Sequence, residues 1–269
     1  MSMQGIAGKR VLVTGGGRGI GAAITTAFVR HGARVLVNYH RHAEDAERLC
    51  ADLQAAHGAD VATPFRADIA RPDEVDAMFE HAIRHLGGVD VLVDNAGLET
   101  VHPALDLSLD AWDTVMNVNL RGAFLCAQRA ARQMLDQGTG GVIVNNSSIH
   151  ESVPRLGLAH YCVSKAGLHM LTKALALEWA EHGIRVLGVS PGAIETEMNR
   201  GEIDAFGREH FDSWIPAGRV GQVGDVSEFT VFLASDAAAY CTGTHVTLDG
   251  GYRLALVRYD PREKLAGEK

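Results

Sequence analysis

Residues 11–21, Val-Leu-Val-Thr-Gly-Gly-Gly-Arg-Gly-Ile-Gly, decide the fold of this chain. A short apolar run ends at Thr14, a glycine-rich turn follows, and an Ala-rich amphipathic segment covers residues 22–30. In such a strand–turn–helix unit, glycines let the backbone approach a pyrophosphate, whose charge is stabilised at the helix N-terminus. The end of the strand places the turn at Gly15, Gly19 and Gly21. We therefore predict a nucleotide site here that also includes Arg18 and Ile20.

The rest of the chain alternates between strands and helices. Apolar runs typical of buried parallel strands occur at residues 11–13, 34–38, 61–65, 89–93, 141–148, 185–189 and 244–248. Amphipathic segments occur at about residues 22–30, 43–58, 73–86, 110–137, 161–182 and 225–234. This order predicts a single α/β domain over residues 1–269, a Rossmann-type doubly wound parallel sheet with helices on both faces. We interpret residues 195–220 as a variable substrate region and residues 252–269 as a C-terminal tail.

Composition narrows the classes of function. The chain has 269 residues, a formal net charge of −8 and no long basic run, which argues against nucleic acid or an anionic membrane as the main partner. No apolar run approaches the ~18 residues of a membrane span, and residues 1–10 do not resemble a leader. Four cysteines without a C-x-x-C pair are typical of a reduced compartment. We expect a cytoplasmic protein with a small-molecule substrate.

Metal ligands are not clustered in the sequence. Among the 13 histidines there is no H-E-x-x-H motif and no His/Cys group at zinc spacing. His81 and His85 lie four residues apart on a predicted helix, where a solvated surface explains both. We predict no metal site.

Ligands of doubly wound sheets bind beyond the carboxyl ends of the strands. The residues that fall there, in addition to the glycine turn, are Asn38, Arg41, Asp68, Ile69, Asn95, Ala96, Gly97, Ser148, Pro191 and Gly192. NAD-selective sites usually carry an acidic residue about 20 residues beyond the glycines, and the segment 38–41, Asn-Tyr-His-Arg, has none. Arg41 and Arg18 can instead bind a 2′-phosphate, or both are surface arginines. We expect a preference for NADP(H), with NAD(H) possible.

Tyr161 and Lys165 lie on one face of a predicted helix, four residues apart. A nearby cation favours the phenolate and lowers the pKa of a tyrosine toward the range of general acid–base catalysis. That spacing alone is weak evidence, but Ser148 precedes Tyr161 by 13 residues and follows a predicted strand. The pattern leaves open whether Asn119, in the helix over residues 110–137, faces solvent or polar partners inside. Residues 198–218 lack clean periodicity and form either a mobile lid or an ordered pair of surface helices.

Taken in order, these residues resemble the short-chain dehydrogenase/reductase family over residues 11–251. The motifs are T-G-x-x-x-G-I-G, D-N-A-G, N-V-N-L, S-S, Y-x-x-x-K, P-G-x-I-x-T and D-G-G. The resemblance implies a seven-stranded doubly wound sheet, an NAD(P) cofactor and a homotetramer. Two residues depart from the family pattern: Asp94 replaces the first Asn of N-N-A-G, and Ser190 replaces the Asn before Pro-Gly. We expect both departures to affect local hydrogen bonding and not the activity.

The resemblance also implies roles for individual residues. Tyr161 exchanges a proton with the substrate, and Lys165 lowers its pKa and holds the nicotinamide ribose. Ser148 hydrogen-bonds the reacting oxygen, and Asn119 helps to place a relay water. The turn at Gly15–Gly21 takes the pyrophosphate. The remaining contacts would be Asp68 with the adenine, Asn95 with the adenosine, and Ile194 and Thr196 with the nicotinamide.

Two segments, residues 95–112 and 147–161, resemble bacterial glucose 1-dehydrogenases. Glu99, His150 and Glu151 would supply hydrogen bonds to a polyol, and a site of this kind discriminates strongly because leaving a substrate hydroxyl unpaired is costly. In the alternative interpretation, Glu99 and Glu151 are solvated and His150 packs beside Ser148. The leading hypothesis is an NADP(H)-preferring aldose 1-dehydrogenase. One alternative is reduction of a 3-oxoacyl thioester or another small ketone, with Arg129, Arg132 and Arg155 as hints of a carrier-docking patch. A more remote alternative is a catalytically silent nucleotide sensor.

Overall fold

A seven-stranded, all-parallel sheet forms the centre of the computed structural model, which describes residues 3–255 apart from the side chains of Met198, Asn199 and Glu202. The strands lie in the order β3-β2-β1-β4-β5-β6-β7. Their bounds are β1 Arg10–Val13, β2 Arg34–Tyr39, β3 Ala62–Arg66, β4 Val91–Asp94, β5 Gly141–Asn146, β6 Ile184–Pro191 and β7 His245–Leu248. From β1 the strand order runs to β2 and β3 on one side and to β4, β5, β6 and β7 on the other, so the connections after β1 and β4 lead away in opposite directions and leave a crevice for ligands. The predicted doubly wound sheet is confirmed.

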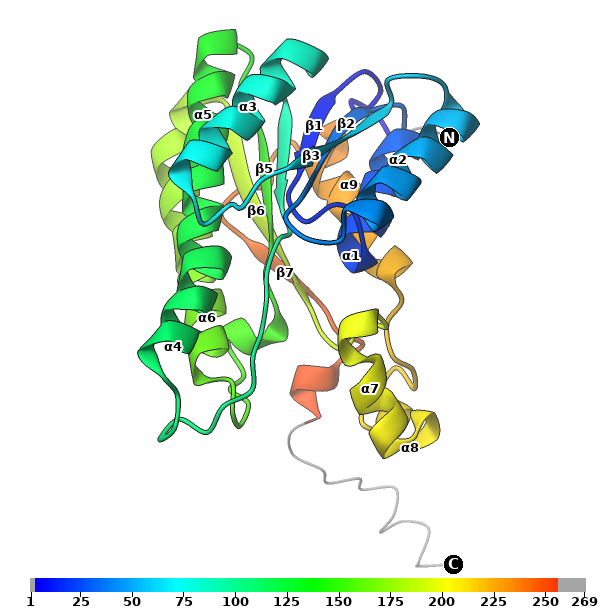
Figure 1. The fold of residues 1–269 in the computed structure, drawn as a ribbon, viewed down its shortest axis with the longest axis vertical. Helices are drawn as coiled ribbons and strands as arrows, with labels where there is room; N and C mark the ends of the chain where they lie inside the picture. The colour runs from blue at the N-terminus through cyan, green and yellow to red at the C-terminus, as the bar shows by residue number, and fades with distance from the viewer. Residues whose placement is uncertain (1–2, 256–269) are drawn as a thin grey trace, which may run out of the picture.

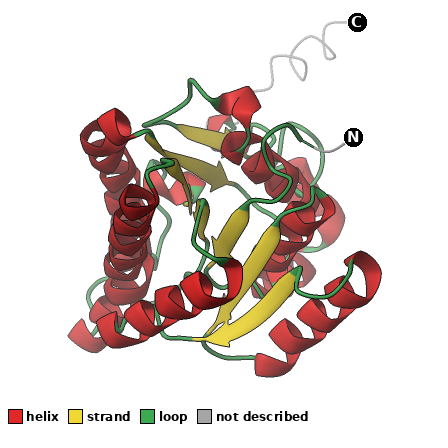
Figure 2. Ribbon diagram, turned by 90° about the horizontal axis from the view of Figure 1, so that it is seen from above, coloured by secondary structure: helices red, strands yellow, loops and turns green. Residues whose placement is uncertain are grey.

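Helices cover both faces of the sheet (Figures 1 and 2). Helices α1 Gly19–Arg30, α2 Ala43–His57 and α9 Val223–Ala234 lie on one face, and α3 Pro72–Leu86, α5 Ala123–Gln137 and α6 Ala159–Trp179 on the other. Successive strand residues point to opposite faces, so Val11 and Val13 pack with Phe28 of α1 while Leu12 packs with Phe79 of α3. The remaining short elements are η2 Ile149–Glu151, η3 Ala180–His182, η4 Asp236–Ala238 and η5 Tyr252–Leu254.

Most predicted bounds are shifted by one or a few residues, and two differences are informative. The strand predicted from residue 89 begins at Val91, because the backbone N–H and C=O of Val89 bond the side chain of Gln137, at 2.8 and 3.0 Å, instead of a neighbouring strand. The helix predicted over residues 110–137 is divided into α4 Leu109–Met116, a π-helical segment η1 Asn117–Gly122, and α5. Single π-turns inside helices are often found at functional sites. Here the π-turn contains Asn119, and no simple amphipathic pattern signals it.

Most of residues 198–218, which lack a clean pattern, lie in two short helices, α7 Glu197–Phe206 and α8 Arg208–Ser213, at the lower right of Figure 1. Ile203, Phe211, Ile215 and Val220 form a small apolar cluster beneath them. The ordered helix pair is therefore what the structure shows, whereas closure over a ligand stays a prediction. Of the predicted C-terminal tail, residues 256–269 lie outside the described residues. Within the described part, no helix has the length and apolar character needed to cross a membrane.

Candidate active site

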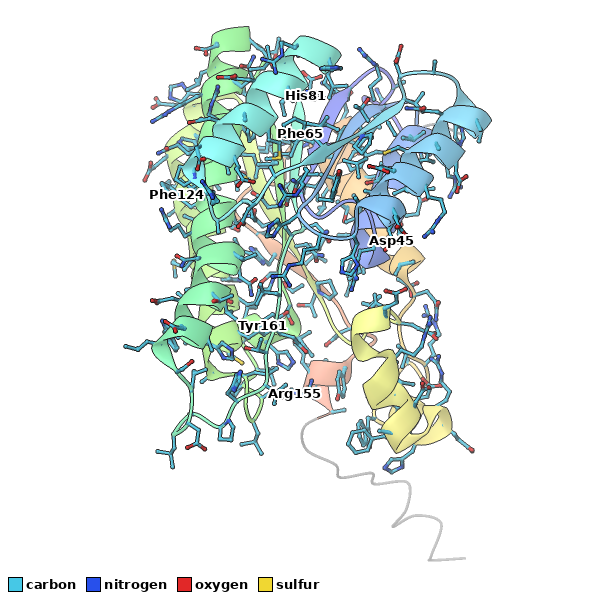
Figure 3. All side chains as sticks on the ribbon, viewed as in Figure 1. Asp45, Phe65, His81, Phe124, Arg155 and Tyr161 are labelled. Atoms are coloured by element: carbon cyan, nitrogen blue, oxygen red, sulfur yellow. The ribbon has the colours of Figure 1, made fainter. Side chains whose placement is uncertain are left out.

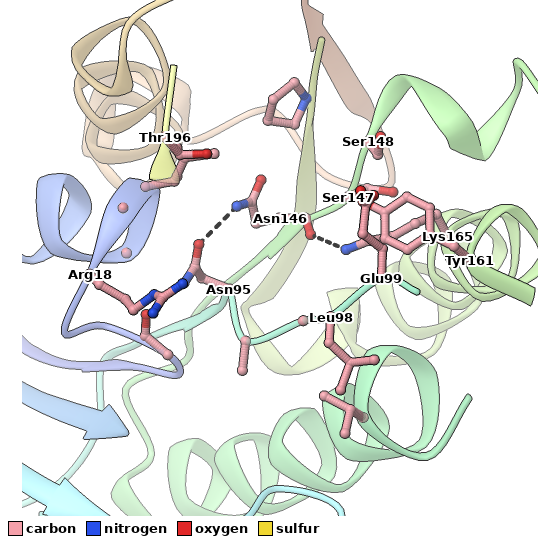
Figure 4. A pocket seen from close by; sticks show the side chains of 18 of the residues that line it. Arg18, Asn95, Leu98, Glu99, Asn146, Ser147, Ser148, Tyr161, Lys165 and Thr196 are labelled. Atoms are coloured by element: carbon pink, nitrogen blue, oxygen red, sulfur yellow. Dashed lines mark hydrogen bonds between the residues drawn. The ribbon is translucent and has the colours of Figure 1, made fainter. Parts of the chain in front are cut away.

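A cavity of about 820 Å³ opens at the carboxyl ends of the strands. That volume is within the usual range for small-molecule sites. Every residue predicted to contact cofactor or substrate lines it except Glu151, and Arg155, expected only in a carrier-docking patch, lines it too, together with the unpredicted Glu197 and Tyr252. Figure 4 shows Arg18 and Thr196 on one side of the cavity and Glu99, Tyr161 and Lys165 on the other. Asn119 is not among the lining residues.

The glycine turn between β1 and α1 is held by two asparagines. Gly15 and Gly19 have φ angles of +59° and +53°, a region that favours glycine. Asn38 accepts a hydrogen bond from the N–H of Gly15 at 3.2 Å, and the amide of Asn95 donates to the carbonyl of Gly15 at 2.9 Å. A Cβ at Gly21 would overlap that carbonyl. Asn38 and Asn95 therefore shape the turn through their side chains.

The N-terminus of α1 is suited to an anion. Arg18 occupies the N-cap position without capping the helix, and the first turn contains no acidic residue. The free backbone N–H groups of the first turn of α1 and the helix dipole therefore favour binding of a phosphate group. These residues and the cavity fit a dinucleotide cofactor.

Basic side chains lie at the rim beside β2. Arg18 and Arg41 are both exposed and both line the cavity, and Nη1 of Arg18 is 3.9 Å from Oε2 of Glu197. His40 lies 4.0 Å from the carboxylate of Asp68, whose Oδ1 accepts a hydrogen bond from the N–H of Ala70. No acidic residue is present in the segment 38–42. A 2′-phosphate could be accommodated at this rim.

Tyr161 and Lys165 lie one turn apart near the start of α6, and Ser148 follows β5. Nζ of Lys165 donates a 2.9 Å hydrogen bond to the carbonyl of Asn146 and is 5.6 Å from the centre of the Tyr161 ring. Ser148, itself buried, hydrogen-bonds the Tyr161 hydroxyl. Three of the four predicted catalytic side chains are therefore together at one end of the cavity.

Asn119 faces inward from the π-turn and is 1% exposed. Its Nδ2 donates to the carbonyl of Leu98 at 2.9 Å and to Oγ of Ser164 at 3.1 Å, and its Oδ1 accepts from the N–H of Leu98 at 2.9 Å. The alternative left open by the sequence is thereby decided: Asn119 has polar partners inside. Its hydrogen bonds connect the loop after β4 to Ser164 of α6, the residue before Lys165.

Glu99 and His150 line the cavity near Tyr161. The rings of His150 and Tyr161 meet edge to face with centres 6.1 Å apart, and Nδ1 of His150 is 2.8 Å from the carbonyl of Val153. Next to Glu99, Oγ1 of Thr100 lies 2.7 Å from Nε2 of the fully buried His160, which precedes Tyr161. Sequence reasoning missed His160. The contact fixes the Glu99 loop against the helix that carries Tyr161.

Comparison with known proteins relates this chain to dehydrogenases and reductases. The family described as enoyl-(acyl carrier protein) reductase matches residues 15–253. The chain is 42% identical to 3beta-hydroxysteroid dehydrogenase 1 of Eggerthella lenta, over 92% of this chain and 94% of that protein. It is 40% identical to L-rhamnose 1-dehydrogenase (NAD(P)(+)) of a Sphingomonas species, over 93% and 98%. It belongs to the short-chain dehydrogenase/reductase family.

A solved structure of the same family agrees with this assignment. A gluconate 5-dehydrogenase from Burkholderia cenocepacia, in complex with NADP and tartrate, has a TM-score of 0.86 and 34% identity, covering 95% of this chain and 98% of that one. This short-chain dehydrogenase/reductase is therefore an NAD(P)-dependent oxidoreductase that acts on alcohols and carbonyls. A bound nicotinamide supplies or accepts the hydride in this chemistry. The protein must hold the reacting oxygen and move its proton.

The predicted lowering of the Tyr161 pKa by Lys165 is not seen in this short-chain dehydrogenase/reductase. Burial raises the pKa of the Tyr161 phenol, the negative charge of Glu99 raises it further, and only the hydrogen bond with Ser148 acts in the opposite direction. Burial also lowers the pKa of Lys165 to about 8. The sequence argument considered the cation but not the loss of water around both groups, and the second effect is larger here.

Of the two departures from the family pattern, Asp94 is the more informative. Burial raises the pKa of its carboxyl well above the usual range, with Thr14 acting in the opposite direction. Burial thus favours the neutral, protonated carboxyl, which resembles the amide that the family usually has there. Ser190 lies 3.3 Å from Nδ1 of His245. That neither departure affects the activity stays a prediction.

Glu151 differs from both sequence interpretations, which placed it either against a polyol or in solvent. Its side chain is 4% exposed and does not line the cavity. The carboxylate instead lies 2.9 Å from Nδ1 of His245 and 3.0 Å from Nδ1 of His169. These partners come from β7 and α6, far along the chain, so no local motif could have found them.

Proposed function

We propose that the protein is an NADP(H)-preferring dehydrogenase that oxidises an aldose of glucose-like shape at its anomeric carbon, giving a lactone. The observation that carries the proposal is the pair of hydrogen-bond acceptors, Glu99 and His150, beside Tyr161. The carbonyl of Val153 can only accept, so Nδ1 of His150 holds a proton and Nε2 of the neutral ring is an acceptor. The carboxylate of Glu99 also only accepts. A polyol offers several hydroxyl donors to these two acceptors in the cavity wall.

In this reaction the roles of the side chains follow from their positions. Ser148 would hydrogen-bond the anomeric hydroxyl, and the phenolate of Tyr161 would accept its proton; a nicotinamide, when bound, would supply the hydride acceptor for the same carbon. Lys165, held by the carbonyl of Asn146, provides a positive charge beneath the phenol. This charge stabilises the phenolate form of Tyr161, which must be present before the proton is accepted and becomes a neutral phenol afterwards. The similarity to an L-rhamnose 1-dehydrogenase supports an aldose over an apolar substrate.

A substrate panel tests the proposal. Initial rates are measured with NADP⁺ and glucose, its epimers or rhamnose, beside NADPH with an acetoacetyl thioester and NADP⁺ with a 3β-hydroxysteroid. We expect fast oxidation of at least one aldose and a rise in its KM of at least about tenfold in Glu99→Gln, since a lost hydrogen bond to a charged group is worth about 1.5–3 kcal/mol. Asp106→Asn, an exposed acid of the same loop, is the control and should leave KM unchanged. Activity with the thioester or steroid alone would refute the aldose assignment.

The preference for NADP(H) rests on Arg18 and Arg41 and on the absence of an acid in residues 38–42. Charge-assisted hydrogen bonds to a 2′-phosphate are worth about 1.5–3 kcal/mol. Arg41→Glu should therefore lower the NADP/NAD ratio of kcat/KM by at least about tenfold. Arg84→Glu, an exposed arginine of α3, is the matched control. An unchanged ratio in Arg41→Glu would remove this role.

A second candidate is the reduction of a 3-oxoacyl thioester, by the same residues in the reverse direction. The family match, described as an enoyl-(acyl carrier protein) reductase, and the position of Arg155 in the cavity wall favour it. Of the other arginines expected in a docking patch, Arg129 is paired with Asp76 at 3.0 Å, which weakens its attraction for a carrier. The thioester arm of the panel decides between the two.

We further propose that the enzyme is a cytoplasmic homotetramer. A second, shallow groove between α5 and α6 is lined by apolar side chains that include Phe124, Leu135 and Leu171, and Leu177 nearby is 84% exposed. Contiguous exposed apolar surface is typical of subunit interfaces. Light scattering during size exclusion would give four times the 28.8 kDa chain mass for a tetramer, and the monomer mass would refute it.

A further inference from the structure

A cluster of two histidines and a glutamate lies behind the catalytic serine, outside the cavity. Glu151 ends the short helix η2 that follows Ser148, His169 lies on α6, and His245 begins β7. The side chains of Glu151 and His245 are 4% and 1% exposed, and that of His169 is 29% exposed. One nitrogen of each ring and one carboxylate oxygen all lie within 4.8 Å of one another. The fold thus assembles a group that the sequence separates by up to 94 residues.

The tautomer of His245 is set by its neighbours. Thr172 donates its hydroxyl proton to the carbonyl of Leu168 at 2.9 Å and accepts from the amide of Asn145 at 2.8 Å. Its remaining lone pair faces Nε2 of His245 at 2.8 Å, so Nε2 must be the donor. In the neutral ring, Nδ1 then presents a lone pair toward the carboxylate of Glu151, 2.9 Å away. Two lone pairs at that distance repel unless a proton or a cation lies between them.

His169 provides a second nitrogen in the same position. Its Nδ1 is 3.0 Å from Oε1 of Glu151, yet the contact lacks hydrogen-bond geometry and this buried atom has no hydrogen-bond partner. The two rings are tilted against each other with centres 4.4 Å apart. Both Nδ1 atoms therefore converge on one carboxylate, each from its own side.

We propose that Glu151, His169 and His245 bind a divalent transition-metal ion of the Zn²⁺ type. Two imidazole nitrogens and a carboxylate are a zinc-type donor set, whereas Ca²⁺ and Mg²⁺ take oxygen ligands. Zinc bonds of about 2.0–2.2 Å place tetrahedral ligand atoms roughly 3.4 Å apart, which small rotations of these side chains achieve. Water completes the shell on the exposed side of His169.

The surroundings of the cluster are those of a supported metal site. A ligating histidine usually donates its other ring N–H to a neighbouring acceptor, which fixes the ring, and Thr172 does this for His245. Gly188 leaves room for the same ring, because an added Cβ would overlap it. The hydroxyl of Ser190 hydrogen-bonds the Glu151 carboxylate.

The site has a structural position and not a catalytic one. The ion would link η2, α6 and β7, three elements that are distant in sequence. The N–H of Glu151 donates to the carbonyl of Ser148 at 3.0 Å, and His169 follows Lys165 by one turn of α6. A bound ion would therefore brace the serine and the lysine from behind. The proposal does not depend on the substrate, and it revises the prediction of no metal site.

The test uses the full-length protein, free of any histidine tag and stripped with a chelator. Calorimetric titration with ZnCl₂ measures stoichiometry and affinity, and Co²⁺ substitution reports the ligand geometry from its visible absorption. The ligand variants are His169→Gln, whose half-exposed site tolerates the change, and Glu151→Gln. The control is His85→Gln, because His85 stacks on His81 at 3.7 Å and forms another histidine pair.

We expect one Zn²⁺ per chain in the wild type and in His85→Gln, and a loss of affinity of at least about tenfold in His169→Gln, as for other altered metal shells. Zinc should raise the Tm of the wild type and of His85→Gln but not that of His169→Gln, because a ligand of the folded state alone stabilises it. Three results would each overturn the proposal: no zinc uptake by the wild type, wild-type affinity in His169→Gln, or loss of binding in His85→Gln. If Glu151→Gln does not fold, His169→Gln alone decides.

Discussion

Replacing Asn119 with leucine should destabilise the protein while preserving its side-chain volume. The change removes the hydrogen bonds from Nδ2 to the carbonyl of Leu98 and to Oγ of Ser164, and the bond that Oδ1 accepts from the N–H of Leu98. A buried group left without its partner costs about 1–3 kcal/mol. Leu98 is half-buried, so water replaces part of the loss. We expect a fall of roughly 2–4 kcal/mol in the free energy of unfolding.

For a domain of this size, each kcal/mol lowers the Tm by about 2–4 °C, so Asn119→Leu should melt roughly 5–15 °C below the wild type. Urea unfolding gives the free energy, and thermal melting gives the Tm. Asn117→Leu is the matched control: it lies half-buried in the same π-turn, and we expect a change below about 0.5 kcal/mol. Equal stabilities of the two variants would show that the π-turn does not depend on Asn119.

Three further predictions concern ionisable side chains. Burial alone would raise the pKa of Asp90, but hydrogen bonds from Arg10 at 2.9 and 2.5 Å outweigh it and hold that pKa below the usual range. Asp90→Asn should therefore lose about 1–2 kcal/mol of stability at neutral pH, and in acid titrations this difference should disappear as the pH falls below about 4. Burial lowers the pKa of Lys165 from 10.5 to about 8, so between these pH values the unfolded chain binds more protons than the folded one. As the pH rises from about 8 to 10.5, urea unfolding should therefore show the wild type becoming more stable relative to Lys165→Met. Because the charge of Glu99 raises the pKa of Tyr161, Glu99→Gln should shift the pH profile of kcat for alcohol oxidation to lower pH, and an unshifted profile would place Glu99 away from the phenol.

The sequence was sufficient for the fold and for most of the cavity wall. Apolar strands such as Val91–Asp94, each followed by polar residues, specify a parallel sheet whose carboxyl ends meet, and this placed Asn95, Ser148 and the glycine turn together. A ligand site at such an edge follows from topology. Most of the predicted residues line the cavity, and Asn119 and Glu151 do not.

Features that depend on contacts between distant segments were not predictable. The inward orientation of Asn119 requires a π-turn, which shifts its side chain relative to a regular helix. The raised pKa of Tyr161 requires knowledge of how much water the walls exclude. Glu151 is a loop acid in the sequence, and only the return of β7 beside α6 gives it two histidine partners.

His81 gives a smaller example of the same limitation. It was interpreted as a solvated residue, but it is half-buried and its ring lies 4.5 Å from that of Phe65 (Figure 3). Burial, with the charges of His85 and Arg84, lowers its pKa. A helical pattern alone cannot show that a strand residue lies within reach of that face.

The kcat of Tyr161→Phe, measured with NADP⁺ and the best aldose of the panel, tests the central claim most directly. The substitution removes one oxygen and leaves the ring against His150. General acid–base groups contribute about 10²–10⁴-fold, so we predict a fall in kcat of at least about 100-fold, with the Kd for NADPH, followed by cofactor fluorescence, changed less than about threefold. A variant that kept near-wild-type turnover would contradict the assignment of Tyr161 as the group that takes the proton.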